Sequence, residues 1–113
     1  MNVITTTDAD ATRDFLNAAL TEVRNRPWIQ HATRRESDGG VCATGALFAA
    51  QVTARRHGQA VSGWCLLDAH DRLERAATAL TGTEVTIPMF NDYHAQTKLD
   101  IIRLYEMAIA DCL

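Results

Sequence analysis

Residues 66–80 read LLDAHDRLERAATAL and carry the clearest helical pattern in the chain. Apolar side chains recur there at steps of three or four residues with one adjacent pair, at Leu66, Ala69, Leu73, Ala76, Ala77 and Leu80. This spacing places them on one face of a helix and the charged residues on the other. Gly82 follows and favours a helix end. The stretch predicts an amphipathic helix that begins at Ser62 or Leu66, ends near Leu80 and packs against a core.

A second helix is predicted upstream, over residues 8–25. It follows a capping box in which Thr7 is the N-cap and Asp10 stands at the third helical position. Pro27 ends the pattern, because proline disfavours helical backbone in the residue before it. Residues 1–6 precede the capping box, and we expect them to be flexible.

Two more helices complete the helical part of the sequence. Residues 41–57 have a face of small apolar side chains, which we expect Phe48 and Val52 to widen, and Gly58 follows as a stop. The last helix begins at Thr97, where an aspartate three residues on makes a second capping box.

The remaining segments are predicted to be extended or irregular. Residues 83–90 alternate β-branched side chains before Pro88 intervenes, so an extended segment is expected there. A short hairpin that pairs residues near 29–33 with residues near Val41 is an option that the sequence leaves open. The fold class is therefore mostly α: a compact four-helix single domain over residues 1–113 with one or two short extended segments.

The composition of the chain argues against several classes of function. The chain has 113 residues, 47% hydrophobic and 22% charged, with a net charge of −3. That balance argues against binding to nucleic acid by bulk electrostatics, which needs a basic surplus. No signal peptide and no apolar run of membrane-spanning length occurs. An odd cysteine count of three without a CxxC motif fits free thiols in a reducing cytoplasm. Ten of the eleven basic residues are arginine, a bias that fits the GC-rich coding DNA of actinobacteria and their phages.

Motifs for phosphate, dinucleotide, zinc-protease, serine-hydrolase or calcium chemistry are absent from the sequence. Histidines and cysteines lack the close pairing that structural zinc requires. We therefore expect no cofactor, no metal and no enzymatic activity. One alternative is a cysteine-dependent hydrolase or transferase, in which Cys42 at a helix start is the nucleophile and His94 the base. Asn91 or Asp92 would then orient the imidazole.

A second alternative is a DNA-binding regulator. It depends on convergence of three arginine groups, at positions 24 and 26, 34 and 35, and 55 and 56. Interleaved acidic residues instead favour a solvated face of mixed charge. Trp64, at a loop–helix junction, together with Arg55 and Arg56 is a candidate interface with a protein partner, since tryptophan is frequent in interface hot spots. Homodimerisation through a leftover apolar helix face is also compatible with the sequence.

Residues 39–47 read GGVCATGAL, and Phe90-Asn91-Asp92 precedes the helix start at Thr97. These motifs resemble a family of small uncharacterised proteins of actinobacteria and their phages, over about residues 15–109. The resemblance implies no activity. It does imply that Trp28, Cys42 and the Asn91-Asp92 pair lie together at one end of the bundle. These four residues and His94 form the candidate functional cluster. The working hypothesis is a small intracellular accessory protein that binds another protein, such as a host factor.

Overall fold

Helix α1 (Asp8–Asn25) is the element against which the other long helices pack. The computed structural model describes residues 8–112, so the expected flexible segment 1–6 and the Thr7 cap lie outside the described residues. The other elements are β1 (Arg34–Arg35), β2 (Gly40–Val41), α2 (Ala43–Arg56), α3 (Gly63–Thr81), α4 (Ile87–Met89), the π-helix η1 (Phe90–His94) and α5 (Lys98–Ala110). The fold is mostly α, as predicted, with α4 and η1 in addition to the four helices expected.

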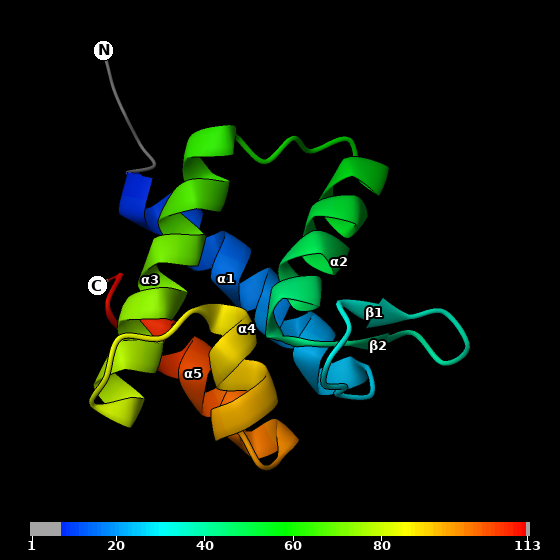
Figure 1. Cartoon of the computed structure of the whole chain (residues 1–113). Helices are drawn as coiled ribbons and strands as arrows, with labels where there is room; N and C mark the ends of the chain where they lie inside the picture. Colours follow the sequence, from blue (N-terminus) through cyan, green and yellow to red (C-terminus); the bar gives the residue numbers. More distant parts are fainter. Residues whose placement is uncertain (1–7, 113) are drawn as a thin grey trace.

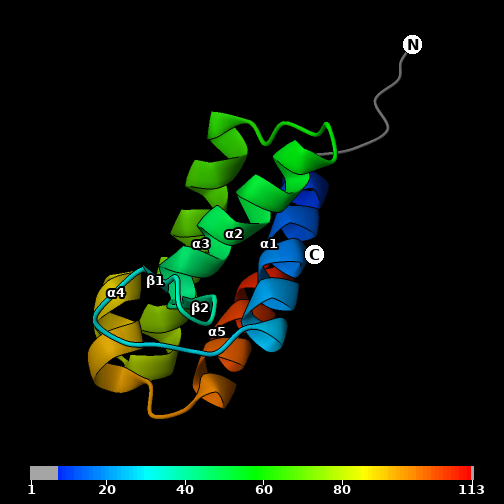
Figure 2. The same ribbon diagram turned by 90° about the vertical axis from the view of Figure 1, so that its right-hand side faces the viewer.

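The long helices surround α1 without forming a regular bundle. Helices α2, α3 and α5 each pack on α1, and α3 also packs on α5. Figure 1 shows α2 and α3 standing apart, joined at one end by the connection of residues 57–62, and Figure 2 gives the same arrangement from the side. The largest fully buried apolar side chains come from α1, α3, α4 and α5, namely Leu16, Leu73, Ile87, Ile101, Leu104 and Tyr105. No helix among residues 8–112 is long and apolar enough to cross a membrane.

A short hairpin projects beside the first turn of α2. Strands β1 and β2 pair antiparallel, with Arg34 opposite Val41 and Arg35 opposite Gly40. The hairpin that the sequence leaves open is therefore present, but its first strand lies after residues 29–33. Segment 27–29 instead runs parallel to β2 on its other edge, because Ile29 N–H donates to the carbonyl of Val41 at 3.1 Å. β2 is thus the middle of three extended segments.

The prediction of an extended segment over residues 83–90 is wrong in its second half. Helix α4 begins at Ile87, and Thr86 is its N-cap, whose hydroxyl accepts from the N–H of Met89 at 3.3 Å. Pro88 does not interrupt this helix, because proline is well tolerated in the first helical turn, where its missing N–H has no partner to lose. The chain then continues into η1, with Ala95 N–H donating to the carbonyl of Phe90 at 2.8 Å.

Candidate functional site

The side chain of Asn91 is fully buried and connects three segments of the chain. Its Oδ1 accepts from the indole Nε1 of Trp28 at 2.8 Å and from the backbone N–H of Ala43 at 2.9 Å. Its Nδ2 donates to the carbonyl of Ile29 at 3.0 Å and to Oδ1 of Asp92 at 2.9 Å. Every hydrogen-bonding position of the amide is therefore used. Asn91 fixes the segment before the hairpin and the start of α2 relative to η1.

The wide turn of η1 is itself held by Gln30. The end of a helix leaves carbonyl groups without partners inside the helix. Here the Nε2 of Gln30 donates to the carbonyls of Asn91, Asp92 and Ala95, at 3.1, 3.3 and 3.2 Å. Because π-helical turns place their residues differently from α-helical ones, this contact keeps the Asn91 side chain aimed inward.

His31 adopts a left-handed backbone conformation, with φ of 67°, which is uncommon for a residue with a side chain. Asp92 stabilises it, because its Oδ1 accepts from the N–H of His31 at 2.8 Å. Burial acts to raise the pKa of the Asp92 carboxyl, but the hydrogen bonds from His31 and Asn91 outweigh it and lower that pKa below its usual value. The imidazole of His31 lies in the open, edge-on to the ring of Tyr93 at 5.9 Å.

Cys42 is the N-cap of α2 and is 7% exposed. Its Sγ accepts from the N–H of Gly45 at 3.3 Å, and its own N–H donates to the carbonyl of Thr33 at 3.1 Å. The hydroxyl of Tyr105 donates to the carbonyl of Ala43 at 2.7 Å. A side chain on Gly45 would overlap the carbonyl of Thr33. The first turn of α2 thus lies directly against the hairpin, and this contact requires glycine.

The structure brings Trp28, Asn91 and Asp92 together at the start of α2, with Cys42 beside them, and it leaves His94 outside this cluster. His94 is exposed and stacks on the ring of Phe90 at 6.2 Å. Within residues 8–112 no hydrogen bond joins the Cys42 sulfur to the imidazole, and the contact of that sulfur is the helix cap. The same part of the chain has no group of three or more histidine, cysteine or acidic residues placed to hold a metal ion.

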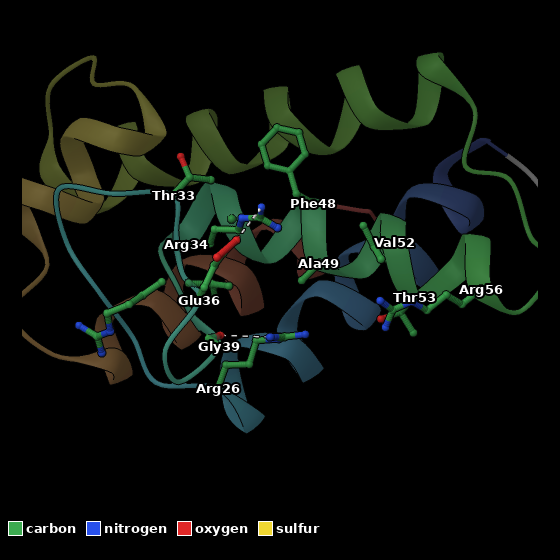
Figure 3. A pocket seen from close by; sticks show the side chains of 13 residues that line it. Arg26, Thr33, Arg34, Glu36, Gly39, Phe48, Ala49, Val52, Thr53 and Arg56 are labelled. Carbon is green, nitrogen blue, oxygen red and sulfur yellow. Dashed lines mark hydrogen bonds and ion pairs between the residues drawn. The ribbon is translucent and has the colours of Figure 1, made fainter.

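A groove of about 550 Å³ lies between the hairpin and α2, and the Asn91 cluster positions both of its walls. Figure 3 shows its lining side chains. Phe48 and Val52 form an apolar strip along α2 and are 56% and 43% exposed. The charged residues that line the groove are Arg26, Arg34, Arg35, Arg56 and Glu36. In a chain with a net charge of −3, four arginines against one glutamate make this groove locally basic.

Two of these arginines build the walls. Arg26 Nε donates to Glu22 at 2.8 Å, and its Nη1 donates to the carbonyl of Gly39 at 3.1 Å, which ties the end of α1 to the hairpin. Arg35 makes two bonds to the carboxylate of Asp38, at 3.0 and 2.6 Å, across the hairpin turn. Each of these guanidinium groups uses two of its five N–H donors in these bonds, which hold the hairpin in place.

A family described as a family of unknown function (DUF6197) matches residues 7–111. The chain belongs to this family. The match covers every helix and strand given above, so the cluster and the groove both lie within the family domain. No curated protein and no solved structure matches the chain.

The sequence did not reveal the groove. Phe48 and Val52 were expected to widen the buried face of the second helix, and this prediction is wrong, because α2 packs on α1 with the opposite face and leaves both side chains in the open. The arginine pairs indicate the groove in part, because the sequence predicts a basic patch where these pairs converge.

The remaining candidate residues are dispersed. Arg24 pairs with Glu106 at 3.3 Å, away from the groove. Arg55 lines a separate, smaller hollow of about 300 Å³ beside Gly58, whereas its neighbour Arg56 lines the groove. Trp64, in the first turn of α3, is 48% exposed and lines neither. Trp64, Arg55 and Arg56 therefore share no single hollow in the described structure.

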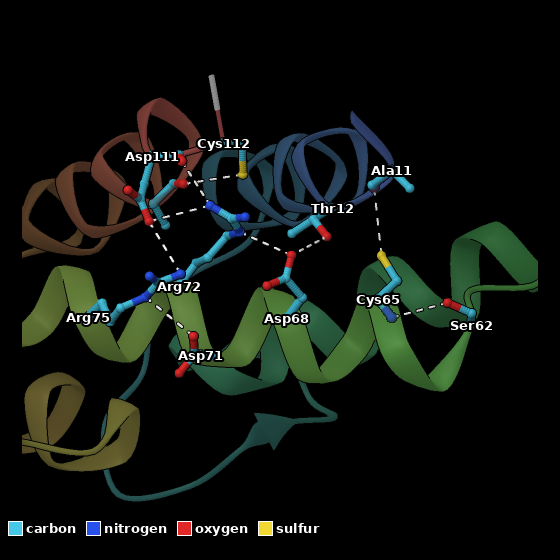
Figure 4. A network of polar contacts seen from close by, with 11 residues as sticks. Ala11, Thr12, Ser62, Cys65, Asp68, Asp71, Arg72, Arg75, Asp111 and Cys112 are labelled. Carbon is cyan, nitrogen blue, oxygen red and sulfur yellow. Dashed lines mark hydrogen bonds and ion pairs between the residues drawn. The ribbon is translucent and has the colours of Figure 1, made fainter. Parts of the chain in front are cut away.

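Outside the groove, a polar network ties three helices together (Figure 4). Thr12 on α1 donates to Oδ2 of Asp68 on α3 at 2.7 Å. Arg72 donates to the same oxygen at 3.0 Å and to the carbonyl of Asp111, after α5, at 2.8 Å. Burial acts to raise the pKa of Asp68, but the bonds from Thr12 and Arg72 prevail and lower it. The groups of this network bond to one another, so we interpret the network as a contact that holds the helices together.

Acid should weaken this network. Because the pKa of Asp68 is lower in the folded chain than in the unfolded chain, the unfolded state takes up the proton first as the pH falls. The stability that Asp68 contributes is present above its unfolded pKa and is lost as the pH drops through its folded pKa. We expect the unfolding free energy of the wild type to fall more steeply between about pH 5 and about pH 3 than that of Asp68→Asn. Urea titrations at several pH values measure this, and equal slopes would contradict the role given to Asp68.

Proposed function

We propose that this protein acts by binding another protein, which it holds in the groove between the hairpin and α2. The observation that carries the proposal is the meeting of exposed apolar side chains and arginines in one groove. Phe48 and Val52 present apolar surface to water, and Arg34 and Arg56 flank it. Aromatic residues and arginine are the side chains that are enriched in protein interfaces.

The shape of the groove favours a macromolecular ligand over a metabolite. Sites for small molecules enclose about 70–90% of the ligand surface. Here one wall is the exposed segment of residues 33–36, and the other wall includes the half-exposed side chain of Phe48. A small molecule would remain largely in water, whereas a partner protein could cover the strip from above.

The charge pattern argues against nucleic acid as the partner. A phosphate backbone needs a continuous row of cations. In the groove, Glu36 stands among the arginines, and Asp38 and Glu22 lie directly behind Arg35 and Arg26. Such alternation of sign suits a protein surface better than a polyphosphate chain.

The proposal extends to the setting in which the protein works. We propose an accessory role in a cytoplasm, in an actinobacterium or in a host cell infected by its phage. The three cysteines are free in the structure, which agrees with a reducing compartment. The excess of arginine over lysine, ten to one, supports GC-rich coding DNA.

The test compares a groove variant with a matched surface variant. Phe48→Ser removes the apolar anchor, and Leu67→Ser removes an even more exposed apolar side chain on α3 that lies outside the groove. Partners captured from a lysate of the source cell are identified, purified and titrated against each variant. We expect Phe48→Ser to weaken binding of the purified partner at least about tenfold, and Leu67→Ser to leave it unchanged. Equal affinities for the two variants would refute the proposal.

A further inference from the structure

We infer that the groove recognises a short acidic segment of the partner in which carboxylates flank an apolar side chain. This inference rests on the proposed function and adds the chemistry of the partner. The apolar side chain would lie on Phe48 and Val52, and the carboxylates would pair with Arg34 at one end and Arg56 at the other.

The four arginines of the groove differ in how far their guanidinium groups are engaged within the chain. Arg26 and Arg35 are engaged by Glu22, Gly39 and Asp38, as described above. Two other guanidinium groups are available to a ligand, one at each end of the apolar strip. Their positive charge favours a ligand that is negatively charged at both ends.

The first available group belongs to Arg34. Its contact with Glu36 is 3.5 Å long, and both side chains are largely exposed, at 74% and 85%. Exposed pairs of this kind contribute about 1 kcal/mol or less to stability. A carboxylate that arrives with its own apolar anchor can therefore replace Glu36 as the partner of Arg34.

The second available group belongs to Arg56. It is exposed in the last turn of α2, and in the part of the chain that the structure describes it has neither an ion pair nor a hydrogen bond from its side chain. A carboxylate beside it would gain an ionic contact without displacing an existing one. Arginine also binds carboxylates with two parallel hydrogen bonds, which fixes the orientation of the ligand.

The spacing sets the length of the segment. Phe48, Val52 and Arg56 follow one another at intervals of four residues, so they lie in one row along α2. Eight residues of helix span about 12 Å. An extended chain covers that distance in about four residues. A segment of about four residues, with one or two apolar residues before an acidic one, therefore matches the row from Phe48 past Val52 to Arg56. An acidic residue on the other side of the apolar residues would face Arg34, which lines the hairpin wall of the groove.

The probe is an unlabelled peptide in which two glutamates stand on each side of a central Phe-Leu pair, titrated calorimetrically against the full chain. Three comparison ligands are a peptide with lysine for every glutamate, a peptide with Ser-Ser for Phe-Leu, and a single-stranded oligonucleotide. We expect the acidic apolar peptide to bind at least about tenfold more tightly than each of them, with an affinity that falls as salt is added. No preference over the lysine peptide, over the Ser-Ser peptide or over the oligonucleotide would overturn the inference.

Charge-reversing variants locate the contacts. Arg34→Glu and Arg56→Glu should each reduce the affinity for the acidic peptide at least about tenfold. Arg103→Glu, on an exposed position of α5, is the matched control and should leave the affinity unchanged. The lysine peptide should bind Arg56→Glu better than it binds the wild type. An unchanged affinity in both groove variants would overturn the inference.

Two further results separate this inference from the proposed function. If Phe48→Ser abolishes binding of the native partner while the acidic peptide shows no preference, the groove binds a protein but the acidic assignment is wrong. Sedimentation of the chain alone tests a second copy as the occupant. A dimer that Arg56→Glu dissociates would show that the acidic surface of another copy fills the groove, and it would overturn the assignment to a separate partner.

Discussion

Gly45→Ala should destabilise the chain by about 3 kcal/mol or more, although the same change usually stabilises a helix by about 1 kcal/mol. The added methyl group would overlap the carbonyl oxygen of Thr33, which is backbone and is itself bonded to the N–H of Cys42. Relief would require the hairpin to move away from α2 and break that bond. Urea unfolding followed by helical circular dichroism measures the loss.

Gly63→Ala is the matched control for this prediction. Gly63 begins α3, and no atom beyond its chain neighbours and the adjacent backbone of its own helix lies within 4 Å of the position that its methyl group would take. We expect this variant to be as stable as the wild type, or more stable by less than about 1 kcal/mol. Failure of Gly45→Ala to fold, beside normal folding of Gly63→Ala, would agree with the structure. A cost below about 1 kcal/mol for Gly45→Ala would show that Thr33 does not lie against α2.

Asn91→Ala is expected to cost about 2–4 kcal/mol, because a buried group left without its hydrogen bond costs about 1–3 kcal/mol. The variant leaves the N–H of Ala43 and the carbonyl of Ile29 without the partner they have in the wild type, and it also releases the indole of Trp28. Equilibrium unfolding gives the size of the loss. Amide hydrogen exchange at Ala43 should accelerate more than exchange in the middle of α3.

A second reading of this variant uses fluorescence. In a Trp64→Phe background the emission comes from Trp28 alone, since the chain has two tryptophans. Asn91→Ala should shift that emission to longer wavelength as the indole gains contact with water. Asn17→Ala is the control, because Asn17 is exposed on α1 and its amide donates to the carbonyl of Arg13, its one partner among residues 8–112. A loss of stability no larger than that of Asn17→Ala would contradict the central position of Asn91.

The sequence predicted those elements whose start and stop signals are local. α1 has the bounds expected from its apolar spacing and Pro27, and α3 ends beside Gly82, which takes the left-handed conformation. At Thr97 the expected capping carboxylate is present, since Asp100 accepts from the N–H of Thr97 at 3.2 Å. In each case the deciding interaction spans only a few residues.

One failure is local, since Thr86 caps a helix where an extended segment is predicted. The other failures concern interactions between distant residues. The hairpin register depends on the pairing of Ile29 with Val41 and on the fit of Gly45 against the hairpin, neither of which local propensity encodes. Exposure of Phe48 depends on which side of α2 faces α1. Apolar residues occur around so much of α2 that several orientations of this helix fit its sequence. The apolar strip of the groove could therefore not be predicted.

The uneven support of α2 gives the molecule a mechanical gradient. The helix is clamped where it starts, by Asn91 and Tyr105, and it leads at its other end into the exposed connection 57–62. Its last bond to another helix is that of the Thr53 hydroxyl to Glu22, at 3.3 Å, so we expect amide hydrogen exchange in α2 to become faster beyond Thr53. A ligand bound as proposed, from Arg34 to Arg56, would order the last turn of α2, and we expect its release to begin there. Under the proposed binding mode we expect the lifetime of the complex to depend on the last turn of α2, while the clamped first turn keeps the hairpin in position.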